Sequence, residues 1–183
     1  MGTPDDVLEC WMRHGPDAWF SRDAALDAEI AGKFADLHIA ASCCELSAWE
    51  ETPEGTLALL LLLDQFPRNL FRGSGHSYAT DGLARLTARR ALAKGFDREV
   101  DPVLRPFFYL PFEHSEDIED QKLSVSLFEK HRDETGDGET LKWAVLHLDI
   151  IARFGRFPHR NQALGRDTTP EEQAYLDEDG FKG

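Results

Sequence analysis

The chain is poor in positive charge and has no long apolar run. Its 183 residues hold 20 Lys and Arg against 34 Asp and Glu, which gives a net charge of −14. A surplus of that size argues against a general nucleic-acid binder and against a partner of anionic membranes. The longest apolar run, residues 57–63, is far shorter than the roughly 20 residues that span a bilayer. The first residues also lack the basic and apolar segments of a signal peptide, so we expect a cytoplasmic chain.

Cysteine and the spacings typical of metal sites are scarce as well. Cys10, Cys43 and Cys44 are an odd set, and none of them forms a C-x-x-C pair. We predict that the adjacent Cys43 and Cys44 are small buried residues rather than a strained disulfide. Spacings such as H-x-x-x-H, and the common phosphate-loop, dinucleotide and serine-hydrolase motifs, are missing. We therefore expect no metal ion and no cofactor, although ligands distant in sequence could still converge.

Helix-start signals, in contrast, are abundant. Threonine, proline and an acid follow one another at positions 3–5, 52–54 and 169–171, and each triplet offers an N-cap hydroxyl and a first-turn carboxylate. Apolar residues recur at helical spacing between the caps, and no alternating run predicts a strand. The connections are short, which predicts one all-α domain over residues 1–183, built of stacked antiparallel helical hairpins. We expect helices over residues 4–13, 22–43, 53–66, 78–95, 102–113, 116–132, 138–154 and 170–178.

The first polar motif directly follows the most apolar helix. Pro67 disfavours helical geometry at Phe66, so the helix should end or kink there. Either the polar residues at this break form internal ion pairs, or they line the edge of a ligand site. These residues are Asp64, Arg68, Asn69 and Arg72.

The second polar motif is rich in arginine. Residues 147–166 carry four Arg against one Asp, whereas residues 1–63 carry 3 basic and 12 acidic residues. The sequence Phe-Pro-His-Arg-Asn at 157–161 resembles Phe-Pro-Arg-Asn at 66–69, so we expect two comparable turns. Arginine suits bidentate capture of a carboxylate or phosphate. The polar residues of this motif are His147, Arg153, Arg156, His159, Arg160 and Asn161.

The third polar motif lies between two predicted helices. Pro111 should break the first helix and Ser115 should cap the second, which leaves Glu113 and His114 in the joint. A histidine beside a carboxylate could do acid–base work near neutral pH. The alternative is structural, with His114 bonded to a carbonyl and the nearby acids stabilising the helix start.

Three segments together resemble a known family. They are LLLLDQFPRN at 60–69, YLPFEHSED at 109–117 and RFGRFPHRN at 153–161, and residues 7–11, 19–20 and 169–172 fit as well. On these residues the chain resembles the bacterial domain-of-unknown-function family 924 over nearly its whole length. Residues 12–14 depart from the family, which more often has an aromatic residue and a glycine there. The resemblance implies a tetratricopeptide-like α/α superhelix and brings no established reaction, cofactor or partner.

Three functional interpretations follow from these motifs. The first is a binding module whose pocket gathers the arginines and histidines of all three motifs around a small anionic ligand or an acidic peptide. The second is a hydrolase or isomerase, with His114 or His147 as general base and Glu113 or Asp149 orienting it. The third is a buried ion-pair network without a ligand. Self-association as a homo-oligomer stays open.

Overall fold

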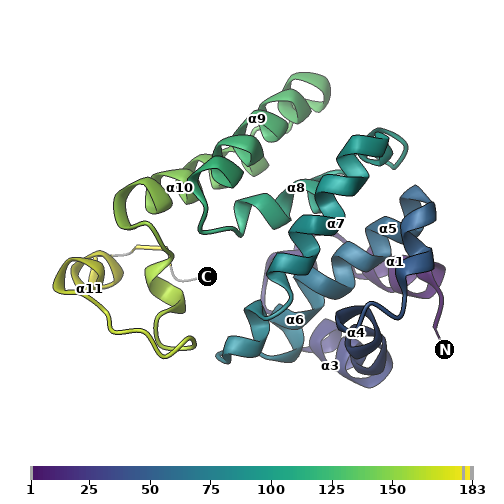
Figure 1. The fold of residues 1–183 in the computed structure, drawn as a ribbon, viewed down its shortest axis with the longest axis horizontal. Helices are drawn as coiled ribbons and strands as arrows, with labels where there is room; N and C mark the ends of the chain where they lie inside the picture. Colours follow the sequence, from purple (N-terminus) through teal and green to yellow (C-terminus); the bar gives the residue numbers. More distant parts are fainter. Residues whose placement is uncertain (1, 179, 182–183) are drawn as a thin grey trace. The chain divides into compact units, whose positions relative to one another are not determined.

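The computed structural model describes residues 2–178 and 180–181. All regular elements of this described part are helical and none is a strand, which confirms the all-α class (Figure 1). No helix in it is both long and apolar enough to cross a membrane. The contacts divide the chain into two compact units: unit 1 is Met1–Arg72 and His76–Pro111, and unit 2 is Gly73–Gly75 and Phe112–Gly183. The single domain and the tetratricopeptide-like superhelix stay predictions.

Unit 1 consists of short helices around an apolar segment. Leu57–Leu63 is buried throughout, and Trp11 stacks on Trp19 with their ring centroids 5.7 Å apart. Phe107 meets both indoles edge-on, at 5.4 and 5.1 Å, so the core of this unit is largely aromatic. Its elements are α1 (Pro4–His14), α2 (Pro16–Trp19), α3 (Ala24–Lys33), α4 (Ala35–Ser42), η1 (Ser47–Glu51), α5 (Pro53–Leu60), η2 (Leu61–Gln65), α6 (Phe66–Leu70), α7 (Asp81–Lys94), η4 (Phe96–Arg98) and most of α8 (Pro106–Glu113).

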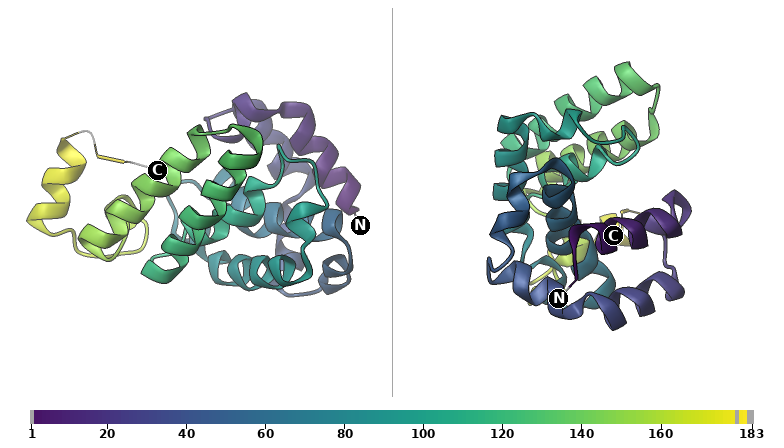
Figure 2. Two further views of the ribbon diagram at one scale, coloured as in Figure 1. Left: turned by 90° about the horizontal axis from the view of Figure 1, so that it is seen from above. Right: turned by 90° about the vertical axis from the view of Figure 1, so that its right-hand side faces the viewer.

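Unit 2 is built on one long helical hairpin. Helices α9 (Ile118–Thr135) and α10 (Glu139–Phe154) are joined by three residues, and Gly136 takes the left-handed conformation that ends α9. The two helices run side by side in both orientations of the ribbon (Figures 1 and 2). After them come η5 (Pro158–Arg160) and α11 (Pro170–Asp177). The unit's core includes Ile150, Ile151 and Phe157.

The predicted helix starts are confirmed at the three Thr-Pro-acid triplets. Thr3 and Thr169 form capping boxes with Asp6 and Glu172, and the Thr52 hydroxyl accepts a bond from the Gly55 backbone N–H. These signals are local in sequence, so tertiary contacts do not override them.

Several other predictions at the N-terminal end are wrong. The single helix expected over residues 22–43 is two helices, because the chain breaks at Phe34, whose φ and ψ are −122° and 0°. The Asp23 side chain caps α3, so this helix begins at Ala24 rather than at residue 22. Cys43 and Cys44 are exposed free thiols, not buried residues, since they lie in the turn that follows α4.

The prolines also act differently from the prediction. The chain passes Pro67 without ending its helix: a π-helical turn, Leu61–Gln65, leads into α6, and Pro67 lies in the first turn of α6 where its missing N–H is not needed. Pro111 lies inside α8 and does not break it. Asp117, not Ser115, caps α9 by accepting from the Glu119 N–H. The helix expected from residue 102 begins at Pro106.

Candidate functional site

The first motif of unit 1 is an ion-pair cluster at the π-helical turn. Arg68 donates through Nη1 and Nη2 to the two carboxylate oxygens of Asp81, at 3.1 and 3.2 Å. Its Nη1 also lies 3.5 Å from Oδ1 of Asp64, a carboxylate that is 1% exposed. Burial lowers the pKa of Arg68, but the charges of Asp64 and Asp81 outweigh it and raise the net pKa. This guanidinium is therefore committed to its own chain.

The same motif holds helix α3. Arg72 donates to both oxygens of Asp27, at 3.1 and 2.8 Å, and the Asn69 amide donates to Oδ1 of Asp27 at 2.7 Å. Burial raises the pKa of Asp27, and the hydrogen bonds from Arg72 and Asn69 lower it further than burial raises it. Arg72 and Asn69 thus both donate hydrogen bonds to one carboxylate, that of Asp27 in α3.

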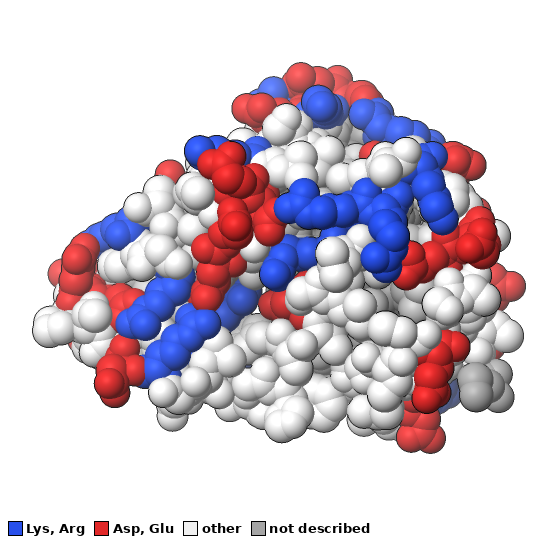
Figure 3. Space-filling model, in the orientation of Figure 1, with Lys and Arg blue, Asp and Glu red and all other residues white. Residues whose placement is uncertain are grey.

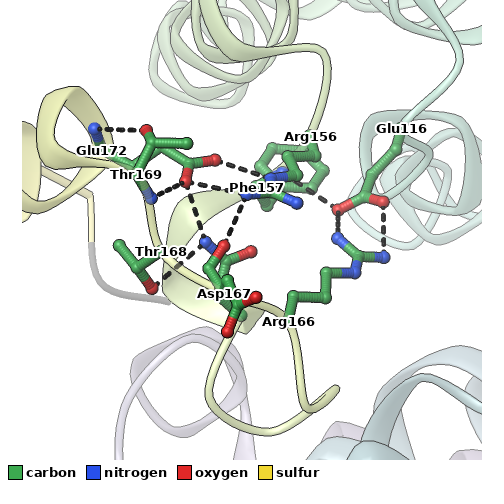
Figure 4. Close-up of polar contacts among 9 residues, drawn as sticks. Glu116, Arg156, Phe157, Arg166, Asp167, Thr168, Thr169 and Glu172 are labelled. Atoms are coloured by element: carbon green, nitrogen blue, oxygen red, sulfur yellow. Dashed lines mark hydrogen bonds and ion pairs between the residues drawn. The ribbon is translucent and has the colours of Figure 1, made fainter.

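The second motif repeats this arrangement in unit 2. Arg156 donates through Nε and Nη2 to the two oxygens of Glu172, at 2.6 and 2.8 Å, and Nη2 also reaches the carbonyl of Asp167 (Figure 4). The Asn161 amide donates to Oε2 of Glu172 at 3.2 Å, and the Thr169 N–H donates to the same oxygen at 2.8 Å. We call Arg156, Asn161 and the Thr169 N–H the carboxylate cradle. Its hydrogen bonds, those from Arg156 first, lower the pKa of Glu172 to about 2.

A second carboxylate lies beside the cradle. Glu116 accepts two bonds from Arg166, both of 2.8 Å, and one from the backbone N–H of Phe157 at 2.9 Å (Figure 4). Burial raises the pKa of Glu116, but the bonds from Arg166 and Phe157 outweigh it and leave the pKa below its usual value. The buried guanidinium of Arg160 stacks on the ring of Phe157, 4.4 Å from its centroid.

The remaining residues of this motif lie nearer to solvent. Arg153 donates to Glu171 at 3.1 Å, and both side chains are more than half exposed. His159 is partly exposed, and its ring lies edge-on to Phe181 at 5.0 Å. On the face shown in Figure 3, groups of Lys and Arg side chains lie directly beside Asp and Glu side chains. Arg153 and Arg156 thus each bind a glutamate of the same unit.

The third motif brings a carboxylate and a histidine together. Oε1 of Glu113 lies 3.3 Å from Nδ1 of His147, and both side chains are about 95% buried. The same Nδ1 lies 2.8 Å from the carbonyl of Trp143, which fits a proton on this nitrogen. His114 is partly buried, with its ring centroid 6.5 Å from that of His147, and Asp149 is exposed on α10. Of the two carboxylates that the enzyme interpretation offers, Glu113 is the one that lies beside His147. Asp149 is exposed on α10 instead.

The predicted site residues thus form two groups. Unit 1 holds Asp64, Arg68, Asn69 and Arg72, and unit 2 holds the other eight. Convergence of all three motifs in one pocket stays a prediction. A pocket of about 40 Å³ in unit 1 is lined by Ser47, Glu50, Thr87, Arg90 and mostly apolar neighbours, and none of the twelve predicted residues lines it.

Sequence reasoning missed most of the acceptors. Asp27 lies 45 residues before Arg72, and Glu116 lies 50 residues before Arg166. Glu172 lies one residue after the predicted helix start at 169–171, but no sequence pattern links it to Arg156. The surplus of acids around the basic motifs is the one sequence signal that points to such pairing. The missed residues are Asp27, Asp81, Glu116, Arg166 and Glu172.

Comparison with known proteins places the chain in a family. The model of the family described as "Bacterial protein of unknown function (DUF924)" matches residues 7–180. The chain belongs to the DUF924 family. It is also similar to a solved structure of a protein of unknown function from Agrobacterium tumefaciens, with 50% identity and a TM-score of 0.89 over 96% of this chain and 97% of that one. No curated protein matches this DUF924 chain.

Proposed function

We propose that this chain is a helical binding module whose carboxylate cradle takes an acidic group of a ligand in place of Glu172. The observation that carries this proposal is the occupant of the cradle. A glutamate in the first turn of α11 receives two guanidinium bonds, one amide bond and one backbone bond. The cradle is thus already bound to a carboxylate, with the bidentate geometry that arginine gives to such groups.

The way α11 is attached supports exchange of this occupant. Among the residues of α11, all of which are described, Glu172 alone is buried. Tyr175 adds a ring contact with Phe154, 5.1 Å between centroids, and is partly exposed. An eight-residue helix is too short to be stable alone in water, so α11 depends on these contacts. The carboxylate, rather than an apolar face, is the main hold on α11.

The occupant also indicates the ligand class. Glu172 is the third residue of α11, after the N-cap Thr169, Pro170 and Glu171, so its carboxylate lies beside the backbone N–H groups of the helix start. A ligand that imitates it is an acidic peptide with a carboxylate in the first turn of a helix. A free dicarboxylate would offer the same oxygens without the helix, and phosphate would offer a tetrahedral group that the planar fork also accepts.

The test compares three full-length proteins: wild type, Glu172→Ala and the double variant Arg156→Ala/Glu172→Ala. The probe is a fluorescent peptide with the sequence of residues 168–175, and glutarate and inorganic phosphate serve as competitors. We expect Glu172→Ala to bind the peptide at least about tenfold more tightly than wild type, because the tethered carboxylate no longer competes. Glutarate should displace the peptide at lower concentration than phosphate.

The double variant is the decisive control. It should return the affinity to the wild-type level or below, since it removes the guanidinium. Equal affinity of Glu172→Ala and wild type, or unchanged binding by the double variant, would overturn the proposal and leave the ion-pair network as the function of these residues. Circular dichroism of all three proteins checks that the α9–α10 hairpin remains folded.

A further inference from the structure

A second cluster of reactive side chains lies in unit 1 and shares no residue with the three motifs. Cys10 and His14 are four residues apart on α1, so both point to the same side of that helix. Glu29 reaches them from α3, with Oε2 2.9 Å from Nε2 of His14. The sulfur, the ring nitrogen and the carboxylate oxygen all lie within 4.8 Å of one another. Three groups of different chemistry from two helices thus meet at one point.

We propose that Cys10, His14 and Glu29 form a zinc site with a fourth, open position for water. Zinc is held by thiolate, imidazole and carboxylate groups at about 2.0–2.3 Å, and tetrahedral geometry places such donor atoms about 3.3–3.6 Å apart. The 2.9 Å between His14 and Glu29 has to widen by only a few tenths of an ångström, and the sulfur, which lies within 4.8 Å of both, has to approach by no more than about 1.5 Å. A softer donor set with sulfur and imidazole favours zinc over magnesium or calcium.

Burial is graded across the site in a way that suits a metal. Cys10 is 2% exposed, whereas the side chains of His14 and Glu29 are 16% and 19% exposed. The sulfur therefore closes the inner side, and the other two groups reach toward solvent, from which the ion and its water would enter. His14 is the last residue of α1, so a modest change of its ring orientation does not disturb the helix.

The charges around the site are those that a cation would replace. Arg13 and Lys33 both donate to Oε1 of Glu29, the Lys33 bond being 2.7 Å long. These two side chains are 52% and 62% exposed, so both can swing into water at little cost. With a thiolate and a carboxylate, the site balances the two charges of the metal ion.

Binding includes one covalent change. The buried Cys10 thiol gives up its proton when the ion binds, because the thiolate is the form that coordinates zinc. The S–H bond breaks, the sulfur binds the ion, and the proton passes to the buffer. No oxidant or reductant is needed. The spacing Cys-x-x-x-His is the sequence signal for this site, and a search for paired histidines does not find it.

The test uses the full chain with Cys43→Ser and Cys44→Ser, because those two exposed thiols would bind metal on their own account. Cobalt replaces zinc as the optical probe, and zinc affinity is measured by competition with a chromogenic chelator. We expect one equivalent of cobalt with the visible bands of a tetrahedral ion and a sulfur-to-cobalt charge-transfer band. Zinc should displace it and raise the melting temperature.

Single substitutions then assign the ligands. Cys10→Ser should abolish the charge-transfer band, and His14→Gln should lower zinc affinity by more than the about 10–100-fold that loss of an outer hydrogen-bond partner costs. Because Cys10 is buried, His14→Gln and Glu29→Gln keep the test decisive if Cys10→Ser fails to fold. Absence of the sulfur band in the parent, or zinc affinity unchanged by His14→Gln and Glu29→Gln, would overturn the proposal.

Discussion

Units 1 and 2 use the same arrangement to hold a helix, with different reinforcement. In unit 1, Asn69 and Arg72 grip Asp27 of α3. In unit 2, Asn161 and Arg156 grip Glu172 of α11. Each asparagine follows a Phe-Pro pair, Asn69 within α6 and Asn161 directly after η5, so the short self-similarity in the sequence corresponds to a shared hydrogen-bond donor to a carboxylate.

The difference lies in what else holds each helix. Helix α3 also buries Leu26 and Ile30, which are 0% exposed, so its carboxylate clamp adds to an apolar contact. Helix α11 buries Glu172 alone. Full burial of one large aliphatic side chain contributes about 1.5–3 kcal/mol, whereas the apolar contact of α11 is the partly buried ring of Tyr175, which packs against the core of Ile150, Ile151 and Phe157. An arginine and an asparagine that bind one carboxylate therefore reinforce an apolar contact in unit 1 and form the principal attachment of α11 in unit 2.

The largest effect should come from Arg68, whose guanidinium faces two buried carboxylates. Arg68→Ala removes the guanidinium that faces the buried carboxylates of Asp64 and Asp81, and loss of one member of such a cluster costs about 3–5 kcal/mol. Urea unfolding followed by tryptophan fluorescence measures this loss. As a control, Arg90→Ala removes a half-exposed pair with Glu50 and should cost less than about 1 kcal/mol. Equal losses in the two variants would contradict the distinction between buried and exposed pairs.

Acid should weaken the attachment of α11 in unit 2. The bonds from Arg156 lower the pKa of Glu172 to about 2, below the ordinary value of about 4.5. A depressed pKa stabilises α11 fully above pH 4.5, and this stabilisation is lost as the pH falls toward 2. We expect constant hydrogen-exchange protection of α11 from pH 7 to 4.5, after correction for intrinsic rates, and a progressive loss below. Loss of protection in α11 already at pH 6 would contradict this assignment.

The two asparagines provide a smaller and direct comparison. Asn69→Ala removes a hydrogen bond to a carboxylate and should lower the free energy of unfolding of unit 1 by about 1–2 kcal/mol. Asn161→Ala should raise exchange in α11 by at least about fivefold, which is what loss of about 1 kcal/mol allows, and leave the unfolding of unit 1 unchanged. If Asn161→Ala instead destabilised unit 1 as much as Asn69→Ala does, the clamps would not act separately.

The smallest effect is expected at the exposed pair of α11. Arg153 and Glu171 are 52% and 67% exposed, and such pairs contribute little in water. Arg153→Ala should change exchange in α11 by less than about twofold. A loss of protection as large as that of Arg156→Ala would show that position, rather than burial of the carboxylate, decides the attachment of α11.

The sequence was informative where structure is decided locally. The caps at Thr3, Thr52 and Thr169 predicted helix starts correctly, because a threonine hydroxyl and the following acid act within one turn. The Gly136 break between α9 and α10 was equally legible. The all-α class and the family followed from such signals. The break at Phe34 and the π-helical turn after Leu60 did not, since packing decides both.

The candidate site was predictable in residue type but not in pairing. Arginine forks near Phe-Pro turns indicated carboxylate or phosphate capture, and the structure shows carboxylates in them. Their partners Asp27 and Glu116 lie more than 40 residues away in sequence, where no local pattern links them. The pairing of Glu113 with His147 could not be predicted for the same reason, because the two residues are 34 positions apart and meet only in the folded unit.

Hydrogen exchange of α11 in Arg156→Ala shows whether the bonds between Arg156 and Glu172 are what holds this helix. This substitution removes the guanidinium and leaves the capping box of Thr169 and Glu172 intact. The account predicts that the amides of α11 lose at least about tenfold of their protection, whereas those of α9, α10 and unit 1 keep theirs. Protection of α11 equal to that of the wild type would show that the carboxylate is not what holds this helix, and would contradict the account.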